Sequence, residues 1–372
     1  MTETASSEKK ILALAIVITC LCMAPFAQAQ TNADSAQIYG QRAVDMMDRN
    51  QPEAAIDAWE RAIALAPTNL AFRYEYALAN VMAKRYDSAI AILTPIYRER
   101  ELLDRGYQLI GNCYDMKNDS SKSLPLYREG LQAFPKSGRL HYEMGAAALI
   151  DANPTSAVDW WVQGTRAEPA FATNYYWLAK TLSATKDRIW GVLYSEAFLN
   201  LERNTQRTRD ISKLVFDTWN VSISLGDSLD PINFCSDSLL DKNSPNGPTT
   251  MSFPVAFEFT TATAAAHLSP ADGVTKRLNV GQLVDIRARM TRAWEKGGYD
   301  KMYPNDVLSW NVRFQKAGWL KEYLWWVYSY GDKREMNEYF KANEEKYDTF
   351  LGWFGQNSPS FKEPLCLDLR CQ

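Results

Sequence analysis

The sequence predicts an all-helical protein in which pairs of antiparallel helices repeat along the first half of the chain. The distance in sequence from Pro67 to Pro135 is twice the distance from Pro135 to Pro169, and both are multiples of 34 residues. This spacing suggests a repeat with a period of 34. When this period is laid along the chain, two columns contain only glycine, alanine or serine. The first column is Ala43, Ala77, Gly111, Gly145 and Ala179, and the second is Ala55, Ala89, Ser123, Ala157 and Gly191.

The two columns have a physical explanation in paired helices. Where two helices of a pair cross closely, only a small side chain fits, and larger neighbours fill the remaining space. Pro67, Pro135 and Pro169 then end the second helix of a pair, because proline cannot continue the helical hydrogen-bond ladder. Asn50 and Asn153 stand where the turn inside a pair is expected, and asparagine is a suitable helix cap.

These residues resemble the tetratricopeptide repeat over residues 34–205. The five repeats in this register are 36–69, 70–103, 104–137, 138–171 and 172–205. Repeat two departs from the pattern, with Glu101 at the proline position and Arg73 at an aromatic position, and repeat five ends on Arg203 instead of proline. An ordinary helical bundle is the alternative. The resemblance implies a right-handed superhelix with a concave inner face.

The resemblance also implies that the first helix of each pair lines this face, which we call the groove. The groove residues are then Tyr74, Arg105, Gln108, Asn112, Arg139, Tyr142, Tyr176 and Lys180. Tyrosine offers a large contact area with a polar tip and arginine a forked donor, so we expect a partner peptide or helix. Alternatively, the C-terminal region folds back and fills the groove. A clamp for a partner's C-terminal carboxylate is disfavoured, because Gly40, Val44 and Glu75 occupy the positions that its polar and basic groups would need.

The remainder of the chain is predicted to be mostly helical. A helix over 206–224 would cap the repeats, and 225–250 is a loop rich in Asp, Ser, Asn, Pro and Gly. In the helical region 251–372, the segment 253–267 fits a strand or a helix. Further helices are expected within 280–294, 309–314, 320–330 and 334–354, as irregular pairs or as a small docked domain. The region resembles the C-terminal parts of exported repeat proteins of Bacteroidetes.

Aromatic residues are abundant, with 12 Trp and 19 Tyr in the chain. Many gather in the last quarter, namely Trp310, Trp319, Trp325, Trp326, Tyr328, Tyr330 and Trp353. At helical spacing they favour packing between helices. The alternative is a stacking platform for a glycan.

The N-terminus has the features of a secretory signal peptide over residues 1–29. Lys9 and Lys10 precede an apolar run over 11–26, and Ala27-Gln28-Ala29 is a small-x-small cleavage site. We therefore expect cleavage after Ala29 and a periplasmic or cell-envelope location. The apolar run is short for a bilayer core of roughly 30 Å, so an uncleaved anchor is the alternative, and it would be the chain's membrane attachment.

Four cysteines follow the predicted cleavage site: Cys113, Cys235, Cys366 and Cys371. An exported chain permits disulfides, and Cys366 and Cys371 are close enough in sequence to bridge each other. Cys235 paired with either of them is the competing arrangement. A zinc site is not expected, because no Cys-x-x-Cys pair or nearby histidine is present. Cys113 falls in a repeat helix and is expected to be a small buried side chain.

Composition and motifs disfavour several classes of function. The net charge is −3 without a basic block, so no nucleic-acid partner is expected. No nucleophile elbow, phosphate loop, dinucleotide fingerprint or metalloprotease motif occurs, and neither a cofactor nor a metal is expected. We therefore predict a non-catalytic, protein-binding scaffold of the cell envelope. A glycan-binding protein is the alternative, and a hydrolase with a carboxylate pair is a third possibility.

Overall fold

The computed structural model describes residues 32–223, 232–235, 251–268 and 277–367. In these ranges the regular structure is helical, apart from an isolated antiparallel bridge between Ile223 and Ile232. No described helix is both long enough and apolar enough to cross a bilayer. The chain divides into two compact units, Met1–Pro135 and Lys136–Gln372. The predicted signal peptide lies outside the described residues.

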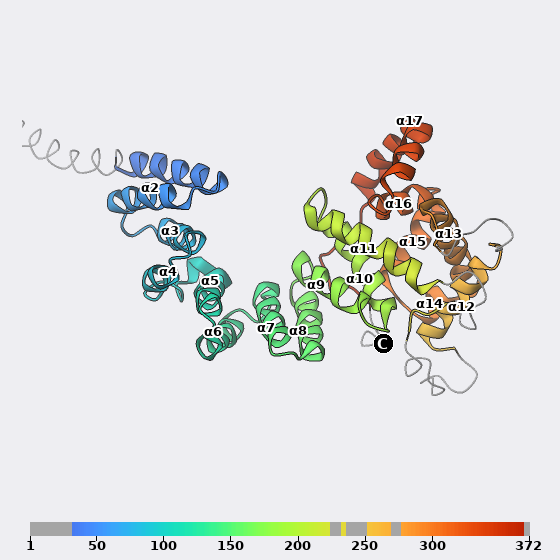
Figure 1. The fold of residues 1–372 in the computed structure, drawn as a ribbon, viewed down its shortest axis with the longest axis horizontal. Coiled ribbons are helices and arrows are strands. Elements are labelled where there is room, and N and C mark those ends of the chain that lie inside the picture. Colours follow the sequence, from blue (N-terminus) through green and yellow to red (C-terminus); the bar gives the residue numbers. More distant parts are fainter. Residues whose placement is uncertain (1–31, 224–231, 236–250, 269–276, 368–372) are drawn as a thin grey trace, which may run out of the picture. The chain divides into compact units, whose positions relative to one another are not determined.

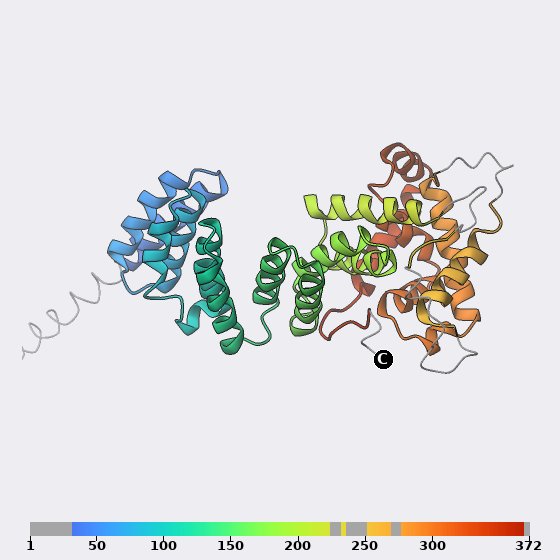
Figure 2. The ribbon, with the colours of Figure 1, turned by 60° about the horizontal axis from the view of Figure 1, so that its bottom comes forward.

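Unit one consists of successive helices that pack against their neighbours in the chain (Figures 1 and 2). Residues 32–48 form its first helix. The others are α2 (Pro52–Leu65), α3 (Leu70–Met82), α4 (Tyr86–Leu93), α5 (Leu103–Met116) and α6 (Ser120–Ala133). Two helices therefore fall within each of the predicted repeats one to three.

Unit two begins with the helices of the predicted repeats four and five and continues directly into the capping helix. These helices are α7 (Gly138–Ile150), α8 (Pro154–Ala167), α9 (Ala172–Ser183), α10 (Arg188–Leu201) and α11 (Gln206–Ser222). The first helices of the pairs are neighbours, since α7 packs on α9 and α9 on α11.

The small-residue columns lie where helices of a pair touch. All ten of their members are buried. A Cβ atom on Gly111 would lie 2.2 Å from the Tyr127 ring, and one on Gly145 would lie 2.2 Å from Nε1 of Trp161. The large aromatic of the second helix thus fills the space that the small residue of the first helix leaves.

The turns inside the pairs share one backbone conformation. Asn50, Lys84, Asn118 and Ala152, at equivalent points of successive repeats, have φ of 56°, 59°, 58° and 55°. This left-handed conformation is unfavourable for side chains other than glycine and asparagine. Asn153 caps α8 as predicted, by accepting a hydrogen bond from the Ser156 amide at 3.0 Å. Asn50 instead provides the left-handed turn, and the cap position of α2 is Gln51.

Repeat two departs from the others, at the place where its sequence does. Its second helix α4 ends at Leu93, and a 3-10 turn, Arg100–Leu102, precedes α5. The intervening segment packs on α5: a Cβ on Gly106 would lie 2.3 Å from the Tyr97 carbonyl oxygen. The ring of Tyr97 also meets Tyr107 edge to face, at 5.4 Å between centroids.

The C-terminal region contributes six helices in the described ranges of unit two: α12 (Phe253–Ala265), α13 (Val280–Lys296), α14 (Tyr299–Met302), α15 (Asp306–Lys316), α16 (Leu320–Val327) and α17 (Lys333–Asn357). The segment for which a strand or a helix was expected is therefore the helix α12. The helix α17 bends at Asn343, whose side chain donates to the Tyr339 carbonyl at 2.9 Å. A single hydrophobic core runs from Ala157 to Leu367, so these helices share their core with the predicted repeats four and five.

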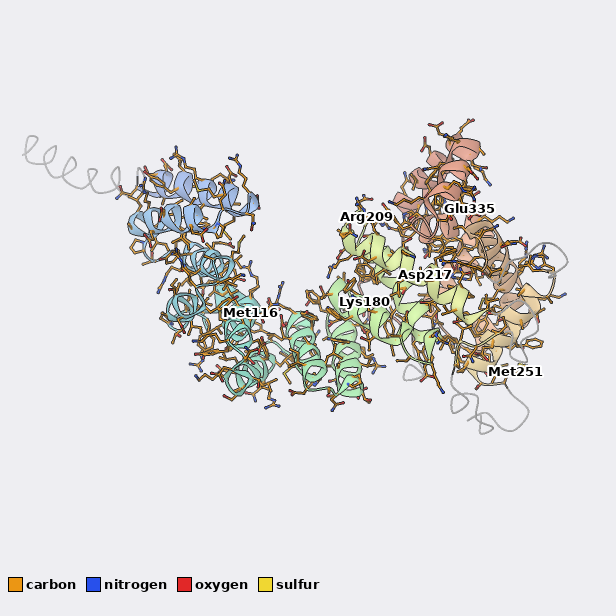
Figure 3. The ribbon with its side chains drawn as sticks, viewed as in Figure 1. Met116, Lys180, Arg209, Asp217, Met251 and Glu335 are labelled. Carbon is orange, nitrogen blue, oxygen red and sulfur yellow. The ribbon has the colours of Figure 1, made fainter. Side chains whose placement is uncertain are left out.

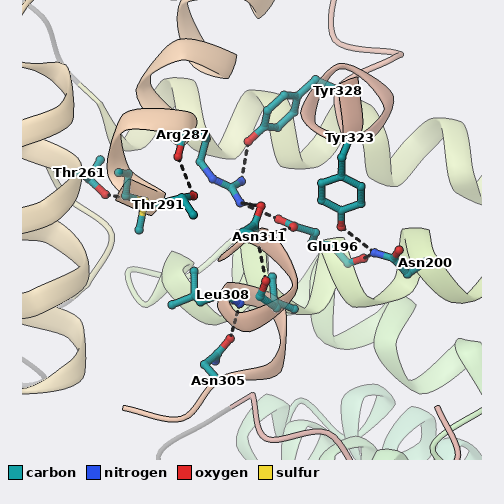
Figure 4. A network of polar contacts seen from close by, with 12 residues as sticks. Glu196, Asn200, Thr261, Arg287, Thr291, Asn305, Leu308, Asn311, Tyr323 and Tyr328 are labelled. Atoms are coloured by element: carbon teal, nitrogen blue, oxygen red, sulfur yellow. Dashed lines mark hydrogen bonds and ion pairs between the residues drawn. The ribbon is translucent and has the colours of Figure 1, made fainter. Parts of the chain in front are cut away.

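A buried polar network ties α10 to the C-terminal helices (Figure 4). Arg287 of α13 donates to Glu196 of α10 at 2.9 Å and to the Tyr328 hydroxyl at 2.8 Å. Asn311 of α15 donates to the other Glu196 oxygen at 2.8 Å. The side chains of Arg287 and Glu196 are 3% and 2% exposed, so the pair lies out of water. The Arg287 guanidinium also lies 4.7 Å from the centre of the Trp219 ring.

Candidate functional site

The eight predicted groove residues are divided between the two units. Unit one holds Tyr74, Arg105, Gln108 and Asn112, and unit two holds the other four. In unit one the Arg105 guanidinium lies 5.3 Å from the ring centre of Tyr74, which is buried. Asn112 is engaged within its own helix pair, because it accepts a hydrogen bond from the Tyr127 hydroxyl at 2.6 Å.

In unit two, three of the predicted residues meet in one cluster on α7 and α9. The ring of Tyr142 stacks on Trp177, with centroids 6.5 Å apart and an interplanar angle of 28°. Tyr176 meets Trp177 edge to face at 5.7 Å. Lys180, labelled on α9 in Figure 3, places its ammonium 5.3 Å from the centres of both the Tyr176 and the Trp177 rings.

The cluster has a fifth member, Arg207 at the start of α11. Its guanidinium lies 5.2 Å from the ring centre of Tyr176. Arg207 is fixed there by hydrogen bonds to Glu202 at 2.9 Å and to the Thr173 hydroxyl at 3.1 Å. Burial opposes ionisation of Glu202, but its hydrogen bonds from Arg207 and Thr205 outweigh burial and lower its pKa.

We call Tyr142, Tyr176, Trp177, Lys180 and Arg207 the aromatic–basic cluster. The sequence prediction missed Trp177 and Arg207. Arg207 could have been predicted from the sequence, because it continues the column of the repeat that contains Arg139 and Thr173. Trp177 could not have been predicted in this way, since the equivalent position one repeat earlier is Glu143.

Arg139, the remaining predicted residue of unit two, is half-buried on α7. Its guanidinium lies 5.6 Å from the ring centre of Phe171, which precedes α9. It therefore packs across the junction between two repeats. It is a less exposed contact point than Lys180, which is exposed.

Among the described residues, the repeat helices and the capping helix supply the surroundings of this cluster. The ring and cation contacts of Tyr142, Tyr176 and Lys180 come from α7, α9, the end of α10 and the start of α11. Phe361, beyond α17, instead meets Tyr175 at 6.0 Å, on the buried side of α9. The cluster is thus built without the C-terminal helices.

The aromatic residues of the C-terminal region are mostly packing elements. Trp310, Trp325 and Tyr328 are buried. Trp325 stacks on Tyr339 of α17 with centroids 4.0 Å apart. An exposed row of rings, as a glycan platform requires, is not formed by these residues. Trp326 is only half-buried, and it lines a cavity of unit two.

Cys113, Cys235 and His141, whose side chains are of types that can react or bind an ion, are buried. Cys113 and Cys235 are buried free thiols, and burial raises the pKa of Cys113 to about 12. The predicted bridge between Cys366 and Cys371 involves a residue outside the described ranges. His141 is buried, with Nδ1 2.7 Å from the Ser137 carbonyl oxygen. The described residues contain no group of acidic, cysteine or histidine side chains arranged to hold a metal ion.

The stacked helix pairs define the class of protein: an α-helical repeat scaffold. A model of the family "Tetratricopeptide repeat" matches residues 46–100, and the described residues have an all-α, tetratricopeptide-like fold. Among solved structures, it is similar to MamA, residues 41 to the end, from Desulfovibrio magneticus RS-1. That likeness has 16% identity and a TM-score of 0.35, and it covers 46% of this chain and 98% of the MamA chain. No curated protein matches the chain.

Proposed function

We propose that the protein is a non-catalytic scaffold that holds a partner polypeptide on the face formed by α7, α9 and α11. The observation that carries the proposal is the aromatic–basic cluster on that face. Tyrosine, tryptophan and arginine, which make up four of its five residues, are enriched at the energetic centres of protein interfaces. The concave faces of helical repeat arrays are the surfaces that such proteins use for binding.

The chemistry of the cluster indicates the kind of segment that it binds. Lys180 supplies a positive charge, Arg207 supplies a guanidinium that is already paired with Glu202, and Tyr142, Tyr176 and Trp177 supply apolar faces with polar tips. A partner segment with acidic and apolar side chains would satisfy both, as a helix or as an extended strand. Because the rings already pack on each other, little side-chain freedom is lost on binding.

The proposed location is the cell envelope, after export and cleavage behind Ala29. This part of the proposal is supported by the charged, apolar and small-residue segments over 9–29. Mass spectrometry of the protein purified from a fractionated native host tests it. A mature chain beginning at Gln30 in the envelope fraction supports the proposal, and an intact N-terminus contradicts cleavage.

Cross-linking and affinity capture from envelope extracts test the binding face. The baits are the wild-type mature protein, Tyr142→Ala/Lys180→Ala, and the control Arg166→Ala, which removes a positive charge from the second helix α8. We expect a discrete partner that the wild type and the control retain and the double variant loses. Circular dichroism establishes that each bait is folded. A partner captured equally by all three baits would show that the cluster is not the binding surface.

A further inference from the structure

Unit two also contains a cavity that is lined by none of the five residues of the aromatic–basic cluster. This cavity of about 450 Å³ is lined by residues from the end of α10, the start of α11, α16 and α17. Cavities of roughly 300 to 1,000 Å³ are typical of sites for small organic ligands. Apolar walls are provided by Trp326, Phe340 and Tyr347. Phe340 and Tyr347 stand on either side of the bend of α17 at Asn343, and their rings meet edge to face with centroids 4.6 Å apart.

The charged groups of the cavity are both cations. Arg203 and Lys333 line it, and no aspartate or glutamate does. In the part of the chain that the structure describes, neither of the two is paired with a carboxylate. Two other ring-stacked arginines of this unit differ from Arg203, because Arg287 is paired with Glu196 and Arg207 with Glu202.

Arg203 is held in place by aromatic rings instead of by a counter-ion. Its guanidinium lies 4.6 Å from the ring centre of Phe354 and 5.6 Å from that of Trp326. The side chain is half-buried, and burial lowers the pKa of Arg203. A half-buried cation without an anion is unfavourable, so an anionic ligand would bind here to a group that is already positioned and incompletely solvated.

We propose that this cavity binds an organic carboxylate with an aromatic or branched apolar body. The carboxylate accepts the forked donors of Arg203, with Lys333 supplying a second positive charge at the rim. The apolar body lies against Trp326 and Phe340. A neutral sugar matches the site poorly, because it would leave both cations without a counter-charge.

The carboxylate could belong to a free small acid or to the C-terminal residue of a polypeptide, because both present the same chemistry. The site is independent of the groove proposal, since none of the five residues of the aromatic–basic cluster lines the cavity. A test of binding at the cavity therefore does not depend on whether a partner binds to α7, α9 and α11.

In the test, the mature protein is titrated with N-acetylphenylalanine and, separately, with its neutral amide. Binding is measured by calorimetry and by tryptophan fluorescence. We expect the acid to bind about tenfold or more tightly than the amide, because the carboxylate accepts charge-assisted hydrogen bonds that the neutral amide does not. Arg203→Gln should abolish this preference, and Lys333→Gln should reduce it. The control Arg313→Gln, which removes an arginine stacked on Phe314 outside the cavity, should bind as the wild type does.

Two results would overturn the proposal: equal affinity for acid and amide, or an acid affinity in folded Arg203→Gln equal to that of the wild type. If Arg203→Gln does not fold, the exposed Lys333→Gln provides the same comparison, and an unchanged acid-to-amide ratio counts against the site. A phenylalanine-terminated hexapeptide with a free or an amidated C-terminus distinguishes the sources. Tight binding of the free-ended peptide identifies a polypeptide end, and binding of the small acid alone identifies a free acid.

Discussion

Replacing Glu196 by glutamine should strongly destabilise unit two. The carboxylate accepts hydrogen bonds from Arg287 and Asn311 at 2.9 and 2.8 Å, one on each oxygen. A glutamine side chain has only one oxygen, so its amide nitrogen would face one of these two donors. The variant would also leave the Arg287 cation without its counter-charge in a buried site.

The expected loss is about 3–5 kcal/mol, the cost typical of removing one partner from a buried ion pair. Unfolding in urea, followed by tryptophan fluorescence, measures it. This probe reports on unit two, because Trp59 alone of the 12 tryptophans precedes Lys136. One of the others, Trp219, lies directly beneath the Arg287 guanidinium.

Two comparisons establish the cause of the loss. Glu295→Gln removes the ion pair between Glu295 and Lys316, which lies at the surface because the Lys316 side chain is 64% exposed. This substitution should lower the free energy of unfolding by less than about 1 kcal/mol. Glu196→Leu/Arg287→Met removes both charges and should recover much of the loss, because no buried charge is left unpaired. If Glu196→Gln costs no more than Glu295→Gln, the buried network does not hold α10 to the C-terminal helices.

Three further predictions concern single positions. Ala152→Gly should stabilise unit two by roughly 0.5–1 kcal/mol in the same urea assay, because glycine adopts the left-handed turn without strain; a loss of stability would contradict this. Gly145→Ala should destabilise by about 1–3 kcal/mol, since its Cβ would overlap Trp161, and an unchanged midpoint would contradict the packing argument. The pKa of Glu202 is lowered in the folded state, so its contribution is present above its unfolded pKa of about 4.3 and is lost as pH falls through the folded value. Glu202→Gln should therefore reduce stability at pH 7 and flatten its decline in acid, whereas identical pH profiles would refute the link to Arg207.

The helix pairs of the first half were predictable because one spacing repeats. A period of 34 puts Gly145 in a column of small residues and predicts a turn near Asn153. In the structure Gly145 lies against Trp161, a contact between residues that are close in sequence. The same period also marks repeat two as irregular at Glu101, where the structure has a shortened helix and a 3-10 turn.

The cavity and the buried network were not predictable in this way. Arg203 meets Trp326, and Glu196 meets Asn311, across long stretches of sequence that contain no repeated spacing. The bend in α17 was missed for a different reason. The sequence around Asn343 has continuous helical character, and the bend accompanies a local hydrogen bond from this side chain to the Tyr339 carbonyl.

The continuous core of unit two has a consequence for how such an array can change in length. Between Arg203 and Gln206, an inserted helix pair would separate Glu196 from Arg287 and divide a core that extends to Leu367. When repeats are gained or lost by duplication or deletion, the C-terminal boundary of the array should therefore stay fixed.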